Sequence, residues 1–418
     1  MLASRRLSLV LLASWIALVS GTPAPAQVRM ADLWKHESVY YDIRTNLPAE
    51  EVQWYADRMD HVYEEFQWLT ADFGGRERQH RPESLFLVET APDYRTLMRS
   101  FGIRAEHAGG MYFSTDSHRR SGLITYVGGR DRHHVLRVLR HEAFHQFAAR
   151  HFGGRLPRWL NEGFAGYFER SIVVDDRIAV GFAAGSDITA LRQIVAERRH
   201  IPLDELFDIS PSAWRRAMRH DRERSRVQYL QSWSMVHFFM HAEEGRYAPA
   251  FQQFLNDLAG GRGGRVAFRE AFGADIAVAE QRWIAYVLEE MAPDRRYLAK
   301  QRLLSVGSQL RFAAERGDLP TTLDEMNVMF DQAEATPPEP GPHGITMPTV
   351  PGDGRSLMSY LDDEDQWVSF ELQEATDDAL PPTVVGSGLT PSPVLVWTRG
   401  FDGQLHYEVT FRTAVDED

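Results

Sequence analysis

The chain of 418 residues contains 43% hydrophobic and 25% charged residues, which indicates a folded protein with two or three domains. It has no cysteine, so disulfides, thiolate zinc sites and cysteine nucleophiles are excluded, and a metal ion would have to be bound by histidine and carboxylate side chains. The formal net charge of −13 argues against nucleic acid as the main partner, because binding phosphates requires a basic surface.

The first 26 residues are predicted to be a signal peptide. Basic Arg5 and Arg6 precede an apolar run from Leu7 to Gly21, and Ala24-Pro25-Ala26 places small residues where a signal peptidase cleaves. A membrane anchor is the alternative, but this run is shorter than the ~20 residues that span a bilayer. No second long apolar run follows. We therefore expect a mature protein without a membrane span, located in the bacterial periplasm or secreted.

The region from 42 to 127 is predicted to mix helices and strands. Apolar residues at helical spacing predict a helix over 49–71 and a shorter one over 93–100. Runs of aliphatic, β-branched and aromatic residues predict strands over 85–88 and 123–127. This alternation is typical of a small sheet covered by helices.

The middle of the chain is predicted to be mostly helical. The clearest helix covers 131–152, and a second one, over 158–171, begins after Pro157. Helical periodicity then dominates from 185 to 298.

The last hundred residues differ in composition from the rest. Residues 319–418 contain 19 Asp and Glu but only three Arg, which suggests a separate module. We predict a domain over 27–295 and an acidic α+β module over 296–418, which offers a surface for a protein partner. Its expected elements are a helix over 296–316, a Pro/Gly-rich stretch over 337–354, strands over 367–372, 394–398 and 405–411, and a hairpin turn at 400–403.

The sequence His141-Glu142-Ala143-Phe144-His145 carries the strongest chemical signal. Residues four apart on a helix project from one face, so His141 and His145 can bind one metal ion with their imidazoles. Glu142 lies about 100° around the helix, where it can take a proton from a metal-bound water.

A third ligand is predicted further along the chain. Glu162 lies in the first turn of the second predicted helix, within the segment Trp159–Glu169. If the two helices run antiparallel, Glu162 returns to the histidine pair. Two histidines and one glutamate leave a coordination position open, which is the catalytic zinc arrangement. Asn161 and Glu169 are candidates for hydrogen bonds to the ligands, although capping and solvation explain them equally well.

The motif His141–His145 followed by Trp159–Glu169 resembles the gluzincin zinc metallopeptidases, and the W-L-N-E-G-F-A segment resembles zinc aminopeptidases. The chain from about residue 40 to 290 is similar to the uncharacterised secreted bacterial branch of the peptidase MA-like superfamily. The resemblance implies a thermolysin-like zincin fold, with a small mixed sheet followed by a helical subdomain. It also implies one Zn²⁺ ion bound by His141, His145 and Glu162, with Glu142 as the general base.

The sequence departs from the aminopeptidases at Gly109-Gly110-Met111-Tyr112-Phe113. Aminopeptidases carry a G-x-M-E-N segment here, whose Glu holds the free amine of the substrate. Tyr112 and Phe113 replace that Glu and Asn, so we expect an endopeptidase.

Tyr229 is the second candidate catalytic residue. The segment Tyr229–Ser234 resembles the Y-x-K-G-x-x segment of the family, whose Tyr donates a hydrogen bond to the oxyanion of the tetrahedral intermediate. The Lys and Gly are missing, and a Tyr packed in a helical core is the alternative.

Two further features have two interpretations each. The strand over 122–127 is either an edge strand that pairs with an extended peptide or an interior strand. His237 and His241 repeat the spacing of four, but no Glu follows His237, so core or surface histidines are favoured over a second metal site.

Together these features predict a secreted zinc metallopeptidase that hydrolyses peptide bonds in peptides or proteins with a Glu-activated water. The alternative is a non-catalytic envelope binding or assembly protein on a peptidase-like scaffold.

Overall fold

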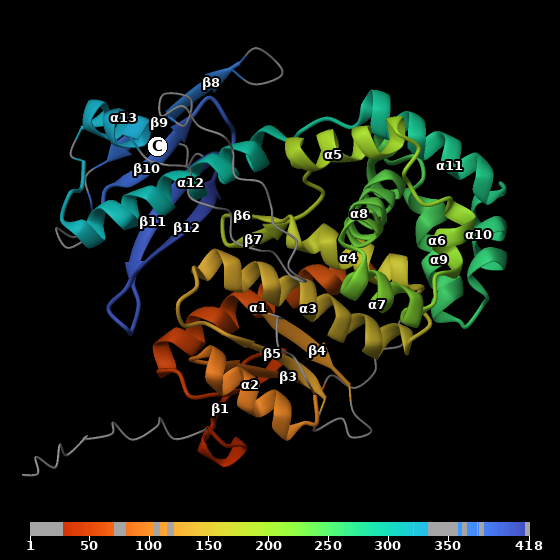
Figure 1. The fold of residues 1–418 in the computed structure, drawn as a ribbon, viewed down its shortest axis with the longest axis horizontal. Helices are drawn as coiled ribbons and strands as arrows, with labels where there is room; N and C mark the ends of the chain where they lie inside the picture. The colour runs from red at the N-terminus through yellow and green to blue at the C-terminus, as the bar shows by residue number, and fades with distance from the viewer. Residues whose placement is uncertain are drawn as a thin grey trace, which may run out of the picture.

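A computed structural model gives the structure of the chain. It describes residues 28–70, 81–103, 109–114, 121–320, 322–332, 358–361, 366–373, 375 and 380–413. The predicted signal peptide and the Pro/Gly-rich stretch 337–354 lie outside these residues. Helices and two mixed sheets make up the described part, which confirms the α+β class (Figure 1).

The first sheet lies in the N-terminal part of the described chain, in the order β1-β2-β3-β5-β4. Side chains alternate along its strands, so Leu85 and Leu87 pack with helices α1 and α3 on one face while Phe86 and Val88 pack with α2 on the other (Figure 1). The elements of this part are β1 (Trp34–Glu37), β2 (Tyr41–Thr45), α1 (Ala49–Thr70), β3 (Glu83–Val88), α2 (Ala91–Ser100), β4 (Gly110–Phe113), β5 (Gly122–Tyr126) and α3 (Arg132–Phe152).

The strand at 122–127 is an interior strand, so the edge interpretation is wrong. β5 pairs in parallel with β3 on one side and antiparallel with β4 on the other. β4, which comes earlier in the chain, takes the edge because it folds back on β5 with Gly110 opposite Thr125. Among the described strands, no strand lies beyond β4.

Helices dominate the middle of the chain, as expected, and they share one apolar core with α1 and α3. None of the helices in the described part is long and apolar enough to cross a membrane. These elements are α4 (Arg158–Glu169), α5 (Gly185–Ala196), α6 (Leu203–Asp208), α7 (Pro211–His220), α8 (Arg222–Gly245), α9 (Ala248–Ala259), α10 (Gly264–Phe272), α11 (Ile276–Ala285) and the short π-helix at Tyr286–Glu290.

The second sheet combines strands from distant parts of the chain, in the order β7-β6-β12-β11-β10-β9-β8. Helix α12 packs against it so closely that a Cβ atom at Gly307 would lie 2.5 Å from the Tyr407 ring. The elements are β6 (Ile172–Val174), β7 (Arg177–Ala179), α12 (Arg295–Arg316), α13 (Leu323–Gln332), β8 (Ser359–Leu361), β9 (Trp367–Gln373), β10 (Thr383–Ser387), β11 (Ser392–Arg399) and β12 (Leu405–Arg412).

The predicted boundary after residue 295 falls at the start of α12, but the sheet beyond it takes β6 and β7 from before it. β12 pairs in parallel with β6, with Phe411 opposite Val174. The two predicted domains are therefore joined through one sheet.

The same sheet contacts the start of α3. Buried Arg132 donates to Glu51 at 2.5 Å and to Thr398 Oγ1 at 2.6 Å, and Arg58 pairs with Glu408 at 2.6 Å. Thr398 on β11 thus holds the first turn of the helix that carries the two histidines, Tyr407 on β12 donates to Asp131 just before it at 3.4 Å, and Glu408 on β12 holds α1.

Candidate metal centre

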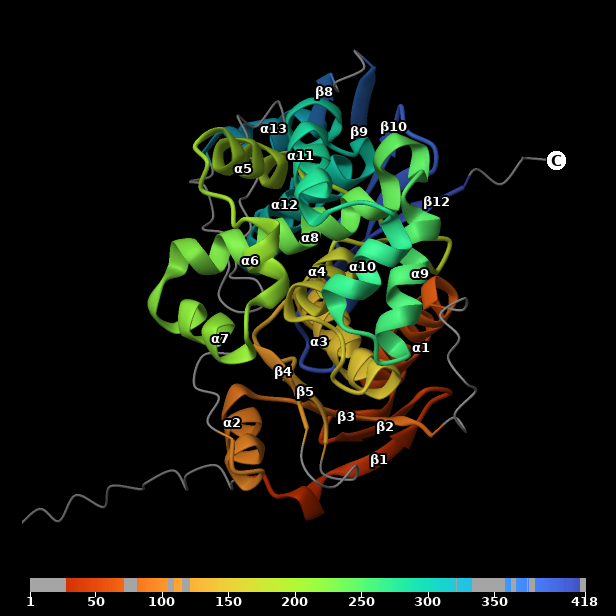
Figure 2. The same cartoon turned by 90° about the vertical axis from the view of Figure 1, so that its right-hand side faces the viewer.

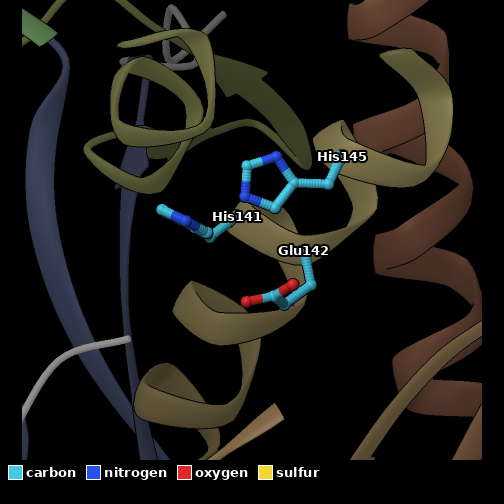
Figure 3. A group of neighbouring side chains, drawn as sticks. All are labelled: His141, Glu142 and His145. Atoms are coloured by element: carbon cyan, nitrogen blue, oxygen red, sulfur yellow. The ribbon is translucent and has the colours of Figure 1, made fainter. Parts of the chain in front are cut away.

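Helix α3 brings His141, Glu142 and His145 together in the interior. The two imidazoles project from one side of the helix, and the Glu142 carboxylate lies beside them (Figure 3). All three side chains are buried, and one ligand atom from each lies within 4.8 Å of the others. The spacing of four residues therefore brings the two imidazoles to one side of α3, as the sequence predicts.

Helix α4 returns Glu162 to this pair. Gly153 ends α3 in a left-handed conformation with a φ of 57°, and α4 begins at Arg158 after Pro157. Glu162 Oε2 lies 3.5 Å from Nε2 of His141 and 3.5 Å from Nε2 of His145. Gly163 lets α4 approach α8, because a Cβ atom there would lie 2.5 Å from the Ser232 carbonyl oxygen.

These three groups fit a small cation. Ligand atoms in a tetrahedral zinc site lie about 2.1 Å from the metal and hence roughly 3.4 Å from one another. The observed separations of 3.5 Å match, and neither His145 Nε2 nor Glu162 Oε2 forms a hydrogen bond within the described chain. Buried polar atoms normally have partners, so these two atoms point to a missing one.

The electrostatics of the site also favour a cation. Burial lowers the pKa of His141, but the carboxylates of Glu162 and Glu169 outweigh it and raise the pKa to about 10. Burial raises the pKa of Glu162, but the neighbouring His145, Arg158 and His141 bring it well below its usual range. In the metal-free chain a proton on His141 thus compensates the buried carboxylates, and a metal ion that displaces this proton would take over that role.

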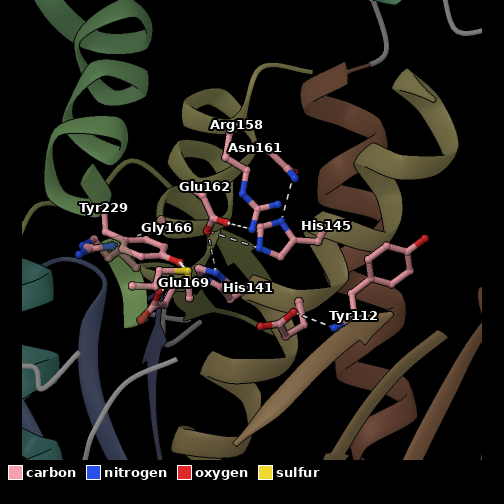
Figure 4. A network of polar contacts seen from close by, with 12 residues as sticks. Tyr112, His141, His145, Arg158, Asn161, Glu162, Gly166, Glu169 and Tyr229 are labelled. Atoms are coloured by element: carbon pink, nitrogen blue, oxygen red, sulfur yellow. Dashed lines mark hydrogen bonds and ion pairs between the residues drawn. The ribbon is translucent and has the colours of Figure 1, made fainter. Parts of the chain in front are cut away.

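The other nitrogen of each histidine also has a partner. His141 Nδ1 lies 3.1 Å from Glu169 Oε2, and His145 Nδ1 lies 3.1 Å from Asn161 Oδ1 (Figure 4). Both oxygens accept, so each Nδ1 keeps its proton, and each Nε2 is the nitrogen that would present a lone pair to a metal ion. Of the two explanations given for Asn161 and Glu169, the hydrogen-bonding one applies.

Arg158 is a site residue that the sequence interpretation missed. Its Nη2 lies 2.7 Å from Glu162 Oε1, which leaves Oε2 directed at the histidines (Figure 4). The spacing of four residues on α4 was the available signal.

Glu142 is held from the edge strand. The backbone N–H of Tyr112 on β4 donates to Glu142 Oε2 at 2.8 Å. This contact orients the carboxylate, as a general base requires. The segment Gly109–Phe113 was singled out in the sequence for its missing Glu, whereas a backbone contact cannot be inferred from residue types.

Tyr229 extends from α8 toward Glu162 and His141 (Figure 4). Its hydroxyl lies 3.4 Å from Met218 Sδ on α7, and its ring packs edge-on against Trp214. Burial raises the pKa of Tyr229 well above its usual range, and the charge of Glu162 adds to this shift. The structure thus places Tyr229 near the centre, while its catalytic role stays a prediction.

Among the residues that the structure describes, His237 and His241 do not form a second centre of this kind. His237 contacts the Tyr286 hydroxyl at 2.7 Å and the Gly181 carbonyl at 3.2 Å, and His241 contacts the Tyr167 hydroxyl at 2.7 Å. No carboxylate takes part in these contacts.

Comparison with known proteins finds a family that matches the region of the candidate site, but the description of that family gives no activity. Residues 136–259 match a family described as "Protein of unknown function (DUF1570)". No curated protein matched the chain. The matched segment extends from α3 to the last residue of α9 and contains all five predicted site residues, namely His141, Glu142, His145, Glu162 and Tyr229.

Proposed function

We propose that this protein is a zinc-dependent metallopeptidase of the gluzincin type, exported to the bacterial periplasm or secreted, that hydrolyses peptide bonds in peptides or proteins. The observation that carries the proposal is the position of Glu162 Oε2, 3.5 Å from Nε2 of both His141 and His145, with Glu142 beside them. Two imidazoles and one carboxylate are the donor set of catalytic zinc sites.

His141, His145 and Glu162 would hold one Zn²⁺ ion. When bound, zinc supplies Lewis acidity that polarises a scissile carbonyl and lowers the pKa of water. Glu142 accepts the proton of the attacking water and passes it to the leaving amine. Tyr112 holds Glu142 in place through its backbone N–H, and Arg158 holds Glu162. Tyr229 donates to the oxyanion once its hydroxyl turns from Met218.

The arrangement of elements supports a thermolysin-like fold. A small mixed sheet precedes the helix with the two histidines, and a second helix packed against it carries the third ligand. A helical part follows and covers α4 with α8. The likeness is one of element order and site placement.

The edge strand supports internal cleavage. Within the part of the chain that the structure describes, β4 pairs with β5 along one side only, so its other side is suited to bind an extended peptide by main-chain hydrogen bonds. An enzyme that trims free N-termini needs an anion for the substrate ammonium. Glu169, a carboxylate beside the centre, already contacts His141 and lies 3.7 Å from Arg137.

The test is hydrolysis by purified protein with measured zinc content. A mixed peptide library, with free and with acetylated N-termini, is incubated with the protein and read by mass spectrometry. We expect internal cleavage of both forms. Stepwise trimming that acetylation abolishes would contradict the endopeptidase proposal. Zinc-loaded protein without any hydrolysis would favour the binding scaffold instead.

A further inference from the structure

A basic surface borders the candidate site. Helix α7 and the first turns of α8 carry five exposed arginines within twelve residues, namely Arg215, Arg216, Arg219, Arg222 and Arg226. None of these five side chains has an ion-pair or hydrogen-bond partner among the residues that the structure describes. Two neighbouring arginines differ, because Arg199 pairs with Glu223 and Arg224 with Glu205.

This surface is the outer face of the helix that covers Tyr229. Trp214 and Met218 on the inner face of α7 contact the Tyr229 ring and hydroxyl. Arg216 and Arg219 lie on the opposite face by helical spacing. Figure 1 and Figure 2 both show α7 at the margin of the helical part that faces the five-stranded sheet. The arginines thus lie on the side of α7 turned away from Tyr229, roughly one helix diameter (~10 Å) from it, a span that about three or four extended residues of a bound chain would cover.

The positive charge of this arginine surface is opposite in sign to the net charge of the whole chain. The protein has a formal net charge of −13, so an exposed cluster of arginines that lack partners among the described residues is a departure that attracts anions locally. Guanidinium groups bind carboxylates in a bidentate geometry. A local cluster in an acidic chain suits a short run of carboxylates better than the long phosphate backbone of nucleic acid, which needs an extended basic footprint.

We propose that the substrate is an acidic polypeptide: the arginine surface of α7 and α8 binds a segment rich in Asp and Glu, while the adjoining peptide bond lies at His141, His145 and Glu162. The inference rests on the proposed function, since it names the substrate class of that site. The arginines act on binding and on the rate of encounter, whereas the chemistry stays with Glu142.

The first experiment measures binding without turnover. Glu142→Gln protein loaded with zinc is titrated into two fluorescein-labelled peptides that share one apolar core, one flanked by four Glu and the other by four Gln. We expect the Glu peptide to bind about tenfold more tightly in low salt, which a few exposed ion pairs together supply. The preference should vanish at ~1 M NaCl, where the Debye length falls to about 3 Å.

Two triple variants locate the effect. R215Q/R216Q/R219Q should bind the two peptides alike, with zinc content and unfolding temperature unchanged. R44Q/R177Q/R269Q is the matched control, because it removes the same charge from three exposed positions on other elements, and it should keep the preference. In the hydrolysis assay, the first variant should raise KM for the Glu peptide without a change in kcat.

Equal binding of both peptides by the parent protein would overturn the proposal, and so would an equal loss in both triple variants. Tighter binding of single-stranded DNA or of vesicles with 30% phosphatidylserine than of the Glu peptide would also overturn it. If the Glu peptide is bound through α7 but neither peptide is ever cleaved, the proposed function fails while the acidic partner stands.

Discussion

Two pairs of histidines spaced four residues apart lie on long helices of this protein, and their surroundings differ. His141 and His145 on α3 face Glu162, with Glu142 beside them. His237 and His241 on α8 face hydroxyl groups and a backbone carbonyl. The pKa of His141 is raised to about 10 by nearby carboxylates, whereas burial lowers the pKa of His237 to about 3. The spacing brings two imidazoles together, and the partners decide whether they can hold a metal ion.

The largest difference between the pairs should be in zinc content. His141→Ala or His145→Ala removes a ligand, so zinc affinity should fall by more than the 10- to 100-fold typical of losing a partner outside the ligands. His237→Ala is the matched control and should retain zinc at the level of the parent protein. Zinc per chain after dialysis, measured by mass spectrometry, checks both. Full occupancy in both ligand variants would refute the site.

Glu142 has no counterpart in the second pair, where Phe238 follows His237. Glu142→Gln keeps the size of the side chain but removes the base. Turnover should therefore fall by ~10²–10⁴-fold while zinc stays bound. Initial rates on a cleaved peptide, with zinc content measured on the same sample, check this. A fully active Glu142→Gln protein would show that another group is the base.

Residues that contact the histidine nitrogens facing away from the centre should have a smaller effect on zinc affinity than the ligands themselves. Glu169→Gln removes the charge that stabilises the proton on His141 Nδ1, so zinc should dissociate roughly 10- to 100-fold more readily. Tyr167→Phe removes the hydroxyl that contacts His241 and should leave zinc affinity unchanged. Competition with a chelator of known affinity measures both variants. Equal zinc affinity in the two variants would contradict the distinction between the pairs.

The second pair should affect acid stability instead. The folded pKa of His237 lies below the unfolded value of about 6.5, so below pH 6.5 the unfolded state binds a proton that the folded state does not. This group should therefore cost about 1.4 kcal/mol of unfolding free energy per pH unit as the pH falls from about 6.5 toward 3.

Urea unfolding in the presence of chelator, at pH 7.5 and pH 5.5, tests this dependence. His237→Gln should lose less stability on acidification than the parent protein. The exposed His220→Gln serves as control and should behave like the parent. A steeper loss in His237→Gln would contradict the assigned direction.

Local patterns in the sequence predicted the elements that carry the site. Apolar residues at helical spacing gave α1 over Ala49–Thr70, close to the expected 49–71, and α3 and α4 begin within a residue of their predicted starts. Glu162 could be assigned because helix spacing and a short connection are both readable from the sequence. Thr90 caps α2 through the Asp93 N–H, which is why that helix begins two residues earlier than expected.

Contacts between distant segments were not predictable in this way. β6 and β7 are three residues each, too short for a pattern, and β6 is completed by β12. The choice of β4 as the edge strand depends on a fold-back that residue types do not encode. The contact of Tyr112 with Glu142 uses a backbone N–H, which every residue except proline has.

Arg132 and Thr398 are 266 residues apart in the chain, yet their contact holds the first turn of α3. Closing a long loop costs only ~0.6 kcal/mol more for each doubling of its length, so this separation reduces the equilibrium stability of the contact only slightly. Contacts between segments so far apart in the chain do, however, form slowly during folding. During refolding, the five-stranded sheet should gain amide-exchange protection before the seven-stranded one. The first turn of α3 should then become protected together with β11 and β12, later than the turns that carry the histidines.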